Sequence, residues 1–206
     1  MGAPLILASA SPRRRDLLGE AGVVFEVVPS DVPEQPAPGE SAEGFARRVA
    51  REKALDVARR RPDAWVLAAD TVVVVDGAIF GKPVDRADGR RMLCALSGRV
   101  HQVLTAVVLR GPQADGAEFL VSTDVEFRSL TAEEIDGYLD SGEPFDKSGA
   151  YAVQGGARAF VRQVRGSYSN VVGLPMDEVV ALLRRCVPHT LRDAGASHGR
   201  RCGELA

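Results

Sequence analysis

The sequence lacks the features that mark secreted, membrane-spanning and zinc-binding proteins. Its 206 residues include only three cysteines and no CxxC pair, which argues against a disulfide framework or a zinc site and favours a reducing compartment. No stretch approaches the roughly 20 apolar residues of a membrane span. The apolar run at the N-terminus reaches Arg13 too soon to be a signal peptide. We therefore expect a cytoplasmic protein with no membrane partner.

An excess of positive charge is also missing. The net charge is -2, from 26 basic and 28 acidic residues, and no basic stripe with interleaved aromatic residues occurs, so a nucleic-acid partner is not expected. The chain has no P-loop, no GxGxxG, no GxSxG and no HExxH. These absences disfavour P-loop NTPases, dehydrogenases, serine hydrolases and zinc peptidases. A small anionic ligand stays compatible with the sequence, because a few local cations are enough to bind it.

The hydrophobic patterns that are present alternate between helix and strand, which predicts an α/β fold. Residues 1–187 are expected to form one domain with two lobes around a cleft, and residues 188–206 a mobile C-terminal tail. The predicted strands are 5–8, 25–28, 65–75, 100–109, 119–127, 151–154 and 160–164, and the predicted helices are 12–21, 42–61, 87–96, 132–142 and 176–186.

The first candidate site is the turn between the first strand and the first helix. Ser9 and Ser11 offer hydroxyls there, the start of the helix offers free N–H groups, and Arg13 and Arg14 offer planar forks that suit phosphate oxygens. Basic residues at a helix N-terminus oppose the macrodipole, so they are poorly placed for stability unless an anion lies between them. The alternative is an ordinary N-cap followed by solvated arginines, and we favour the anion site.

Asp70 is the second candidate, because it interrupts the apolar, β-branched strand 65–75 and is followed by the hydroxyl of Thr71. A carboxylate inside a buried strand is costly unless it is paired or binds a metal. A salt bridge to a nearby lysine would explain it structurally. A functional carboxylate on the floor of a cleft is the interpretation that we favour.

Three further residues are ambiguous when taken one at a time. Lys53 interrupts the inward face of the helix 42–61, where it could instead extend its amine to solvent. Lys82 precedes a proline in a loop, where most lysines are merely solvated. Gln154 follows the Asp146–Lys147 pair and carries an amide that can donate and accept at once, as reading a base edge requires, although an ordinary polar loop is the simpler interpretation.

Taken together, these segments resemble the Maf family of nucleoside triphosphate pyrophosphatases. The matching segments occur in family order between about residue 5 and about residue 183, and they are 9–14, 51–54, 69–73, 81–83, 96–101, 146–151, 154–155 and 166–175. Each segment alone is weak, but the set is highly specific. Ser148 stands where the family more often has alanine.

The resemblance implies a mixed, twisted β-sheet flanked by helices around a substrate cleft, and hydrolysis of a nucleoside triphosphate to the monophosphate and pyrophosphate. Asp70 matches the family's proton acceptor. Arg13, Thr71 and Gln154 match positions associated with the subfamily that prefers dTTP and UTP. The resemblance also implies a divalent cation, Mg²⁺ or Mn²⁺, and homodimers are common in the family.

These expectations give a hypothetical mechanism. Asp70 would take a proton from water or hold the metal, and Glu34 is the candidate second metal ligand because magnesium prefers carboxylate oxygens. Arg13, Lys53 and Lys82 would neutralise the triphosphate, with Ser9 adding a hydrogen bond. Two alternatives stay open: a pyrophosphatase for non-canonical purine triphosphates, and a nucleotide-sensing regulator of division that binds without turnover.

Overall fold

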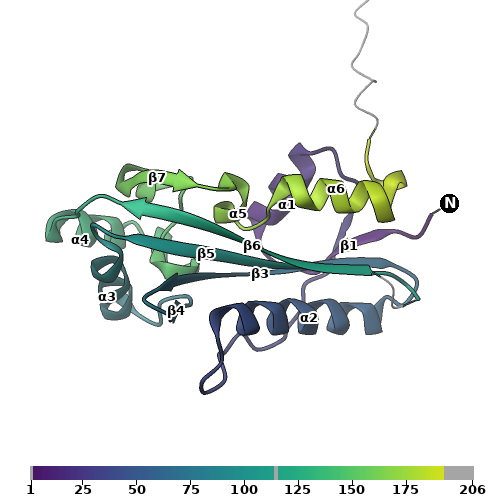
Figure 1. The fold of residues 1–206 in the computed structure, drawn as a ribbon, viewed down its shortest axis with the longest axis horizontal. Helices are drawn as coiled ribbons and strands as arrows, with labels where there is room; N and C mark the ends of the chain where they lie inside the picture. The colour runs from purple at the N-terminus through teal and green to yellow at the C-terminus, as the bar shows by residue number, and fades with distance from the viewer. Residues whose placement is uncertain (1, 114–115, 193–206) are drawn as a thin grey trace, which may run out of the picture.

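A seven-stranded mixed β-sheet forms the centre of the protein, as a computed structural model that describes residues 2–113 and 116–192 shows (Figure 1). The strand order is β2-β1-β3-β5-β6-β7, and β4 pairs separately with β3. The strands are β1 (Leu5–Leu7), β2 (Glu26–Val27), β3 (Trp65–Val75), β4 (Ala78–Phe80), β5 (Val100–Arg110), β6 (Gly116–Phe127) and β7 (Val161–Arg165). The helices are α1 (Pro12–Glu20), α2 (Ala42–Arg60), α3 (Arg86–Leu96), α4 (Ala132–Asp140), α5 (Tyr168–Val172) and α6 (Met176–Cys186).

The direction of the strands explains the mixed character of the sheet. β1 runs parallel to β2 and to β3, whereas the pairs β3–β4, β3–β5, β5–β6 and β6–β7 are antiparallel. Parallel neighbours need a crossover connection, and α1 and α2 provide the connections on either side of β2. The predicted α/β fold with a mixed sheet is confirmed.

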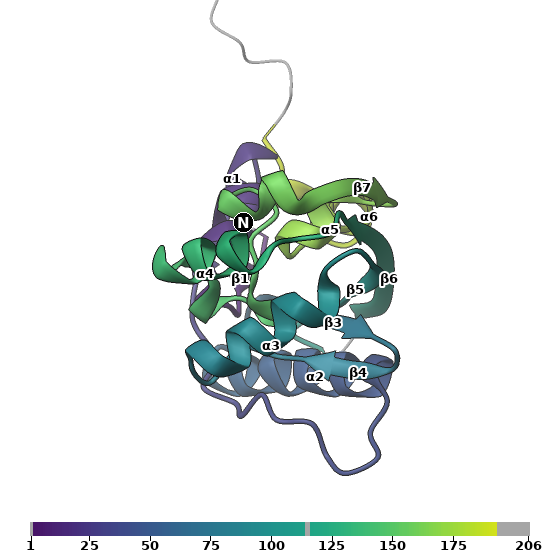
Figure 2. The ribbon, with the colours of Figure 1, turned by 90° about the vertical axis from the view of Figure 1, so that its left-hand side faces the viewer.

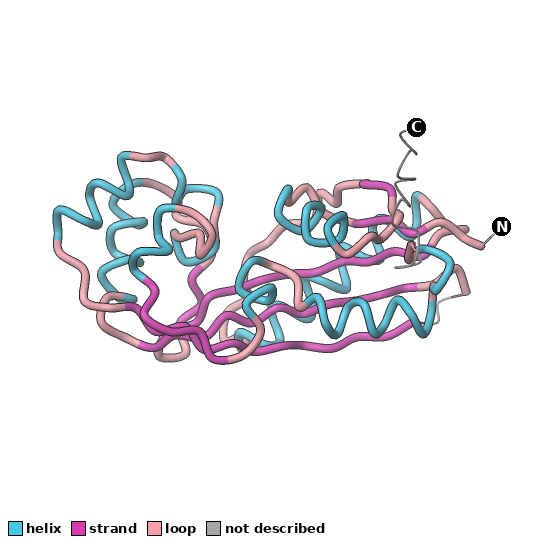
Figure 3. The backbone as a smooth tube through the Cα atoms, turned by 90° about the horizontal axis from the view of Figure 1, so that it is seen from above, coloured by secondary structure: helices cyan, strands magenta, loops and turns pink. Residues whose placement is uncertain are grey.

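Helices cover both faces of the sheet, and a second group lies at one end. α2 packs below the strands and α1 and α6 pack above them, as the end view also shows (Figures 1 and 2). α3 and α4 gather with β4 at the other end of the long strands. Seen from above, β3, β5 and β6 run continuously past both groups of helices (Figure 3). The buried side chains accordingly form three clusters. One lies between α2 and the sheet, one between the sheet and α1 and α6, and one beside α3 and α4.

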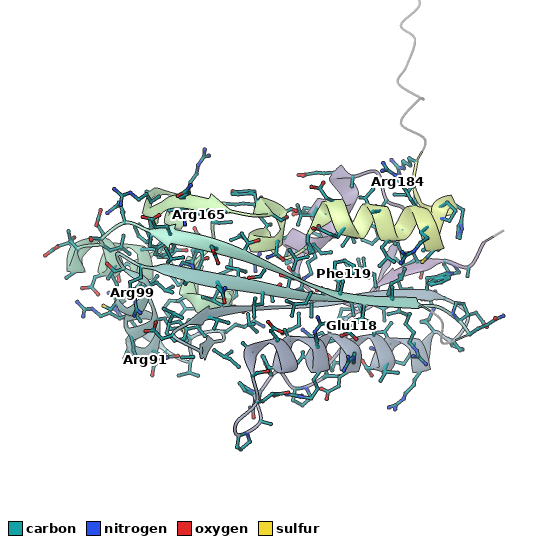
Figure 4. The ribbon with its side chains drawn as sticks, in the orientation of Figure 1. Arg91, Arg99, Glu118, Phe119, Arg165 and Arg184 are labelled. Atoms are coloured by element: carbon teal, nitrogen blue, oxygen red, sulfur yellow. The ribbon has the colours of Figure 1, made fainter. Side chains whose placement is uncertain are left out.

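Salt bridges between α2 and β6 hold α2 on the sheet. Glu118 and Phe119 are neighbours on β6 and point to opposite faces, Glu118 toward α2 and Phe119 toward α6 (Figure 4). Arg47 and Arg51, one turn apart on α2, both bind the Glu118 carboxylate, with N···O distances of 2.9 and 2.5 Å. A carboxylate shared by two guanidiniums constrains the rotation of α2 about its axis, which matters because α2 carries Lys53.

Most of the predicted turn and cap signals are confirmed. Ser41 accepts a hydrogen bond from the N–H of Gly44, and Thr131 closes a capping box with Glu134 at the start of α4. Asp76 and Gly77 both have positive φ, 49° and 76°, between β3 and β4, as a two-residue hairpin turn requires. Ser11 occupies the N-cap position of α1, but its side chain makes no capping bond there.

The predicted strand 151–154 is wrong. Ala150 has a positive φ of 60°, which turns the backbone out of an extended path, and the N–H of Gly155 bonds to the carbonyl of Ala152 at 3.1 Å, closing a turn. The 3₁₀ helix η3 (Gly156–Phe160) follows directly. The strand predicted at 160–164 is confirmed as β7.

Two smaller differences concern the type and the bounds of individual elements. The turn predicted at 166–170 contains the short helix α5, which is capped by Ser167, and β6 begins at residue 116 rather than 119. Of the predicted tail, only residues 188–192 are described: they include the 3₁₀ helix η4 (Pro188–Thr190) and a bridge between Leu191 and Val23. Residues 193–206 lie outside the described residues. Within the described ranges no helix has the length and apolar character needed to cross a membrane.

Candidate active site

The candidate site lies where β3 has a gap along one edge. β1 pairs with residues 65–67 of β3, and β4 pairs with residues 73–75 of the same edge. Within the described chain, no strand pairs with the stretch between them. The alternation of the ladders directs the peptide groups of Ala69 and Thr71 into this gap, and the Thr71 carbonyl accepts a hydrogen bond from Ser148 Oγ at 3.0 Å. Polar backbone is thus available at the middle of an otherwise buried strand.

A cleft of about 280 Å³ opens at this gap and gathers every site residue predicted from the sequence. Those residues are Ser9, Arg13, Arg14, Glu34, Lys53, Asp70, Thr71, Lys82 and Gln154. They come from the turn before α1, the first turn of α1, the loop after β2, the helix α2, the strand β3, the loop after β4 and the turn before η3. Residues 145 positions apart in the sequence therefore line one cavity.

Lys53 joins two carboxylates at the floor of the cleft. Its Nζ lies 2.8 Å from Asp70 Oδ1 and 2.6 Å from Glu34 Oε1. The side chains of Lys53 and Asp70 are only 8% and 6% exposed, whereas that of Glu34 is 40% exposed. The salt bridge considered as the structural explanation for Asp70 therefore exists, and it lies inside the cleft rather than in the core.

Burial and charge separate the two carboxylates. Burial raises the pKa of Asp70 above its usual range, although the nearby ammonium of Lys53 and guanidinium of Arg14 act in the opposite direction. Partial burial would also raise the pKa of Glu34, but Lys53 and Lys82 outweigh it and the net direction is downward. Two carboxylates that share one ammonium but have pKa values pushed apart suit an acid–base pair, with Asp70 as the more basic member.

The two arginines at the start of α1 differ in environment. Arg14 is buried, and it donates from Nε to the Gly173 carbonyl at 2.9 Å, from Nη1 to Ser9 Oγ at 3.2 Å and from Nη2 to Thr71 Oγ1 at 2.9 Å. Burial lowers its pKa, and no carboxylate of the described residues lies within 4.0 Å of it. A buried cation with only neutral partners beside a cleft suits an anionic ligand.

Arg13 is more exposed than its neighbour. Its side chain is 32% exposed, and Nη1 lies 3.9 Å from Asp146 Oδ2, on the opposite wall of the cleft. A pair this exposed contributes little to stability, so Arg13 is free to exchange Asp146 for another anion.

Thr71 and Asp70 are adjacent in β3 and therefore point to opposite faces of the sheet. Asp70 faces α2, whereas Thr71 Oγ1 lies 3.0 Å from Thr105 Oγ1 and accepts from Arg14. Both reach the cleft because the missing neighbour strand leaves the edge open. Gln154 lies across the cleft, exposed, in the turn that replaces the predicted strand.

Sequence reasoning gave too little weight to the loop around Lys147. The Lys147 side chain is only 13% exposed, it lines the cleft and it contacts the Asp146 carboxylate. Gly149 has φ of 72°, and a Cβ there would lie 2.8 Å from Val73, so the loop approaches β3 as only glycine permits. The acidic–basic pair followed by glycine was the available signal, but an ordinary polar loop has the same composition.

His101, which also lies in a matching segment, is part of the core and not of the cleft. It is 2% exposed, its Nε2 lies 2.8 Å from the Tyr151 hydroxyl, and burial lowers its pKa to about 4. The ring is therefore neutral near pH 7 and packs edge-on against Phe127. It is unsuited to act on a ligand in the cleft.

The donor set fits a divalent cation that arrives with its ligand better than a permanently held ion. In the part of the chain that the structure describes, no group of three His, Cys, Asp or Glu side chains could hold a metal. Asp70 and Glu34 nevertheless converge on one ammonium in the cleft. Magnesium is commonly held by one or two carboxylates together with substrate phosphates, and these two residues fit that arrangement.

The fold and the cleft define an α/β protein in which a buried carboxylate of raised pKa lies beside several cations in an open cleft. The Maf-like protein family model matches residues 4–186, and the chain belongs to that family. It is 52% identical over 182 residues to a dTTP/UTP pyrophosphatase of Geobacter sulfurreducens, covering 88% of this chain and 95% of the relative.

Two further comparisons extend this likeness. A dTTP/UTP pyrophosphatase of Anaeromyxobacter dehalogenans is 54% identical over 188 residues, covering 90% of this chain and 95% of the relative. Among solved structures, a HAM1 protein from Coxiella burnetii has a TM-score of 0.51 at 15% identity, covering 89% of this chain and 99% of that chain. At that identity the structural likeness supports the fold alone.

Proposed function

We propose that this protein hydrolyses dTTP and UTP to the corresponding monophosphate and pyrophosphate. The observation that carries the proposal is the buried Asp70–Lys53 pair, which lies in a cleft with further cations and not in the closed core. Relatives at 52% and 54% identity, which match about nine tenths of this chain, are named dTTP/UTP pyrophosphatases, and this supports the substrates. Family membership supports the reaction class.

The chemistry assigns a role to each group around the α-phosphate. A water oxygen forms a bond to the α-phosphorus, the bond from that phosphorus to the bridging oxygen breaks, and pyrophosphate leaves. Asp70 accepts the proton of the attacking water, for which its raised pKa suits it. Arg13, Arg14, Lys53 and Lys82 balance the charge of the triphosphate. Arg14 is already held by neutral partners, whereas Arg13, Lys53 and Lys82 exchange carboxylate partners for phosphate oxygens.

A divalent cation, Mg²⁺ or Mn²⁺, belongs to this proposal. Asp70 and Glu34 would hold it together with phosphate oxygens, and it would supply additional charge neutralisation. Glu34 now pairs with Lys53 and, at 3.6 Å, with Lys82. Because Glu34 is partly exposed and comes from a loop, it can leave these lysines when the triphosphate needs them.

A panel of nucleoside triphosphates, assayed for pyrophosphate release with and without Mg²⁺ or Mn²⁺, tests the proposal. Preferred turnover of dTTP and UTP with metal is expected. Turnover restricted to inosine or xanthosine triphosphate would favour the purine alternative, and tight binding without pyrophosphate would favour a nucleotide sensor. The buried Asp70 carboxylate beside Lys53 argues against a sensor, because binding alone needs no water-activating carboxylate.

Replacing Gln154 by alanine is expected to weaken the preference for pyrimidine nucleotides. The glutamine amide can satisfy a donor and an acceptor on a base edge at once, so its loss removes discrimination more than charge neutralisation. We expect the ratio of kcat/KM for dTTP over dGTP to fall about tenfold or more, the scale of one or two unmade hydrogen bonds. Gln163→Ala, on the exposed edge strand β7, is the matched control. An unchanged ratio would remove Gln154 from base recognition.

A further inference from the structure

The turn that carries Gln154 is held by two residues from outside it, Tyr138 of α4 and Glu143 of the 3₁₀ helix that follows α4. Tyr138 projects from α4 and is 6% exposed, and its hydroxyl accepts from the N–H of Ala152 at 3.0 Å. The same hydroxyl donates to Glu143 Oε1 at 2.8 Å. The second oxygen of Glu143 accepts from the N–H of Gly156 at 3.1 Å. We call this Tyr138–Glu143 pair, with its two backbone contacts, the clamp.

The clamp fixes both ends of the turn. Ala152 and Gly155 begin and end it through their own N–H···O=C bond of 3.1 Å, and the clamp binds the N–H of Ala152 on one side and that of Gly156 on the other. Val153, inside the turn, is buried at 5% exposure, while Gln154 is exposed and lines the cleft. The position of the Gln154 amide therefore depends on backbone contacts that Tyr138 and Glu143 supply.

The clamp needs a carboxylate at position 143 and a glycine at position 155, which the carboxylate approaches closely. Both groups that contact Glu143 are donors, so an acceptor-only side chain satisfies each of them. A Cβ at Gly155 would overlap the Glu143 carboxylate, so the close approach needs glycine there. Burial raises the pKa of the Tyr138 hydroxyl, and the neighbouring Glu143 carboxylate adds to the rise. The hydroxyl thus keeps its proton and donates it.

We propose that Tyr138 and Glu143 are positioning residues that set nucleotide specificity by holding the Gln154 turn, without touching the nucleotide themselves. The proposal rests on the proposed function, because it concerns the base-recognition part of the same cleft. A turn held at both ends loses little freedom when the nucleotide binds, and a pre-ordered amide favours the base that matches it. Releasing the turn should weaken recognition and leave the phosphate chemistry at Asp70 largely intact.

Kinetics of clamp variants test this assignment. Tyr138→Phe and Glu143→Ala are each expected to raise KM for dTTP about tenfold and to lower the kcat/KM ratio of dTTP over dGTP by a similar factor, with kcat within about twofold. Glu143→Gln keeps one acceptor but turns an amide toward the other donor, so an intermediate effect is expected. Glu133→Ala, which removes an exposed carboxylate from the same helix as Tyr138, should behave as wild type.

A second background separates positioning from general damage. In Gln154→Ala protein the clamp has no amide to position, so adding Glu143→Ala should leave the nucleotide ratio unchanged. An unchanged ratio in both single variants would overturn the proposal, as would an equal loss of kcat for every nucleotide or a further fall in the Gln154→Ala background. If Glu143→Ala fails to fold, Tyr138→Phe and Glu143→Gln give the same comparison. Wild-type protein that releases no pyrophosphate from any triphosphate would instead overturn the proposed function.

Discussion

Asp70→Asn protein is expected to release pyrophosphate at least about a hundredfold more slowly than wild type while still binding nucleotide. Asparagine has the shape of aspartate but cannot accept a proton at neutral pH, and it removes one of the two carboxylates available to a divalent cation. The arginines and lysines that would hold the triphosphate stay in place. Initial rates of pyrophosphate release and calorimetric titration with a non-hydrolysable dTTP analogue measure the two properties separately.

The control for this variant is Asp124→Asn, on β6 outside the cleft, which should retain the wild-type rate. Asp70 also balances the charge of Lys53, so the thermal midpoint of Asp70→Asn should be recorded with the rates. A folded variant with near wild-type turnover would show that Asp70 serves only to neutralise Lys53. A folded variant that binds the analogue but does not turn over dTTP supports a catalytic role for Asp70, as proton acceptor or as cation ligand.

Asp70 could be predicted from the sequence because it places a charged side chain in an otherwise apolar strand pattern. A carboxylate in an apolar, β-branched run demands a compensating partner, and this was enough to mark the position. Why the carboxylate reaches solvent was not predictable, because it depends on where two other strands stop. β1 ends at Leu7 and β4 begins at Ala78, and only their separate pairing with β3 leaves residues 68–72 without a neighbour on that edge.

Similar limits explain the differences between Arg13 and Arg14. Adjacent arginines at the start of a helix look alike in the sequence, and both were predicted to bind phosphate. Rotation of about 100° per residue around α1 directs Arg14 into the space between Gly173 and Thr71, while Arg13 stays at the mouth of the cleft. That difference depends on packing between segments 159 positions apart, which no local pattern contains.

The wrong strand at 151–154 has a related cause. Alternating apolar side chains at Tyr151 and Val153 imitate a half-buried strand, and both residues are indeed buried. They are buried at the start of a turn and within it, because Tyr138 binds the N–H of Ala152 that a strand would have offered to a neighbour, and the N–H of Gly155 bonds back to the Ala152 carbonyl. Side chains from a different helix and loop decided the local structure, so the sequence of the turn alone was insufficient.

Replacing Lys53 by methionine should shift the pH dependence of turnover as well as lower it. Lys53 is the main group opposing the rise in the pKa of Asp70, so its removal raises that pKa further and leaves less ionised Asp70 at neutral pH. The acidic limb of the kcat/KM profile for dTTP should therefore move to higher pH. Lys82→Met is the control, because Lys82 is 57% exposed and lies beside Glu34. It should raise KM and leave the acidic limb in place.

The raised pKa of Asp70 also predicts how the stability of Lys53→Met protein changes with pH. In Lys53→Met the folded-state pKa of Asp70 is raised above its unfolded value of about 4, so the folded protein binds the proton more tightly. This contribution to stability is fully present below the unfolded pKa and is lost as pH rises through the folded pKa. The free energy of unfolding, measured by urea denaturation, should thus be lower at pH 8 than at pH 5, by up to about 3 to 5 kcal/mol for an unpaired buried carboxylate.

The double variant Lys53→Met/Asp70→Asn tests whether Asp70 causes the fall in the free energy of unfolding of Lys53→Met at pH 8. With no ionisable group at position 70, most of the extra pH dependence of unfolding should disappear, and stability at pH 8 should recover relative to Lys53→Met. Activity should not recover, because the proton acceptor is missing. If stability stays low at pH 8 in the double variant, the loss comes from the packing of the Lys53 side chain on α2 and not from an uncompensated Asp70. A restored turnover would contradict the role of Asp70 itself.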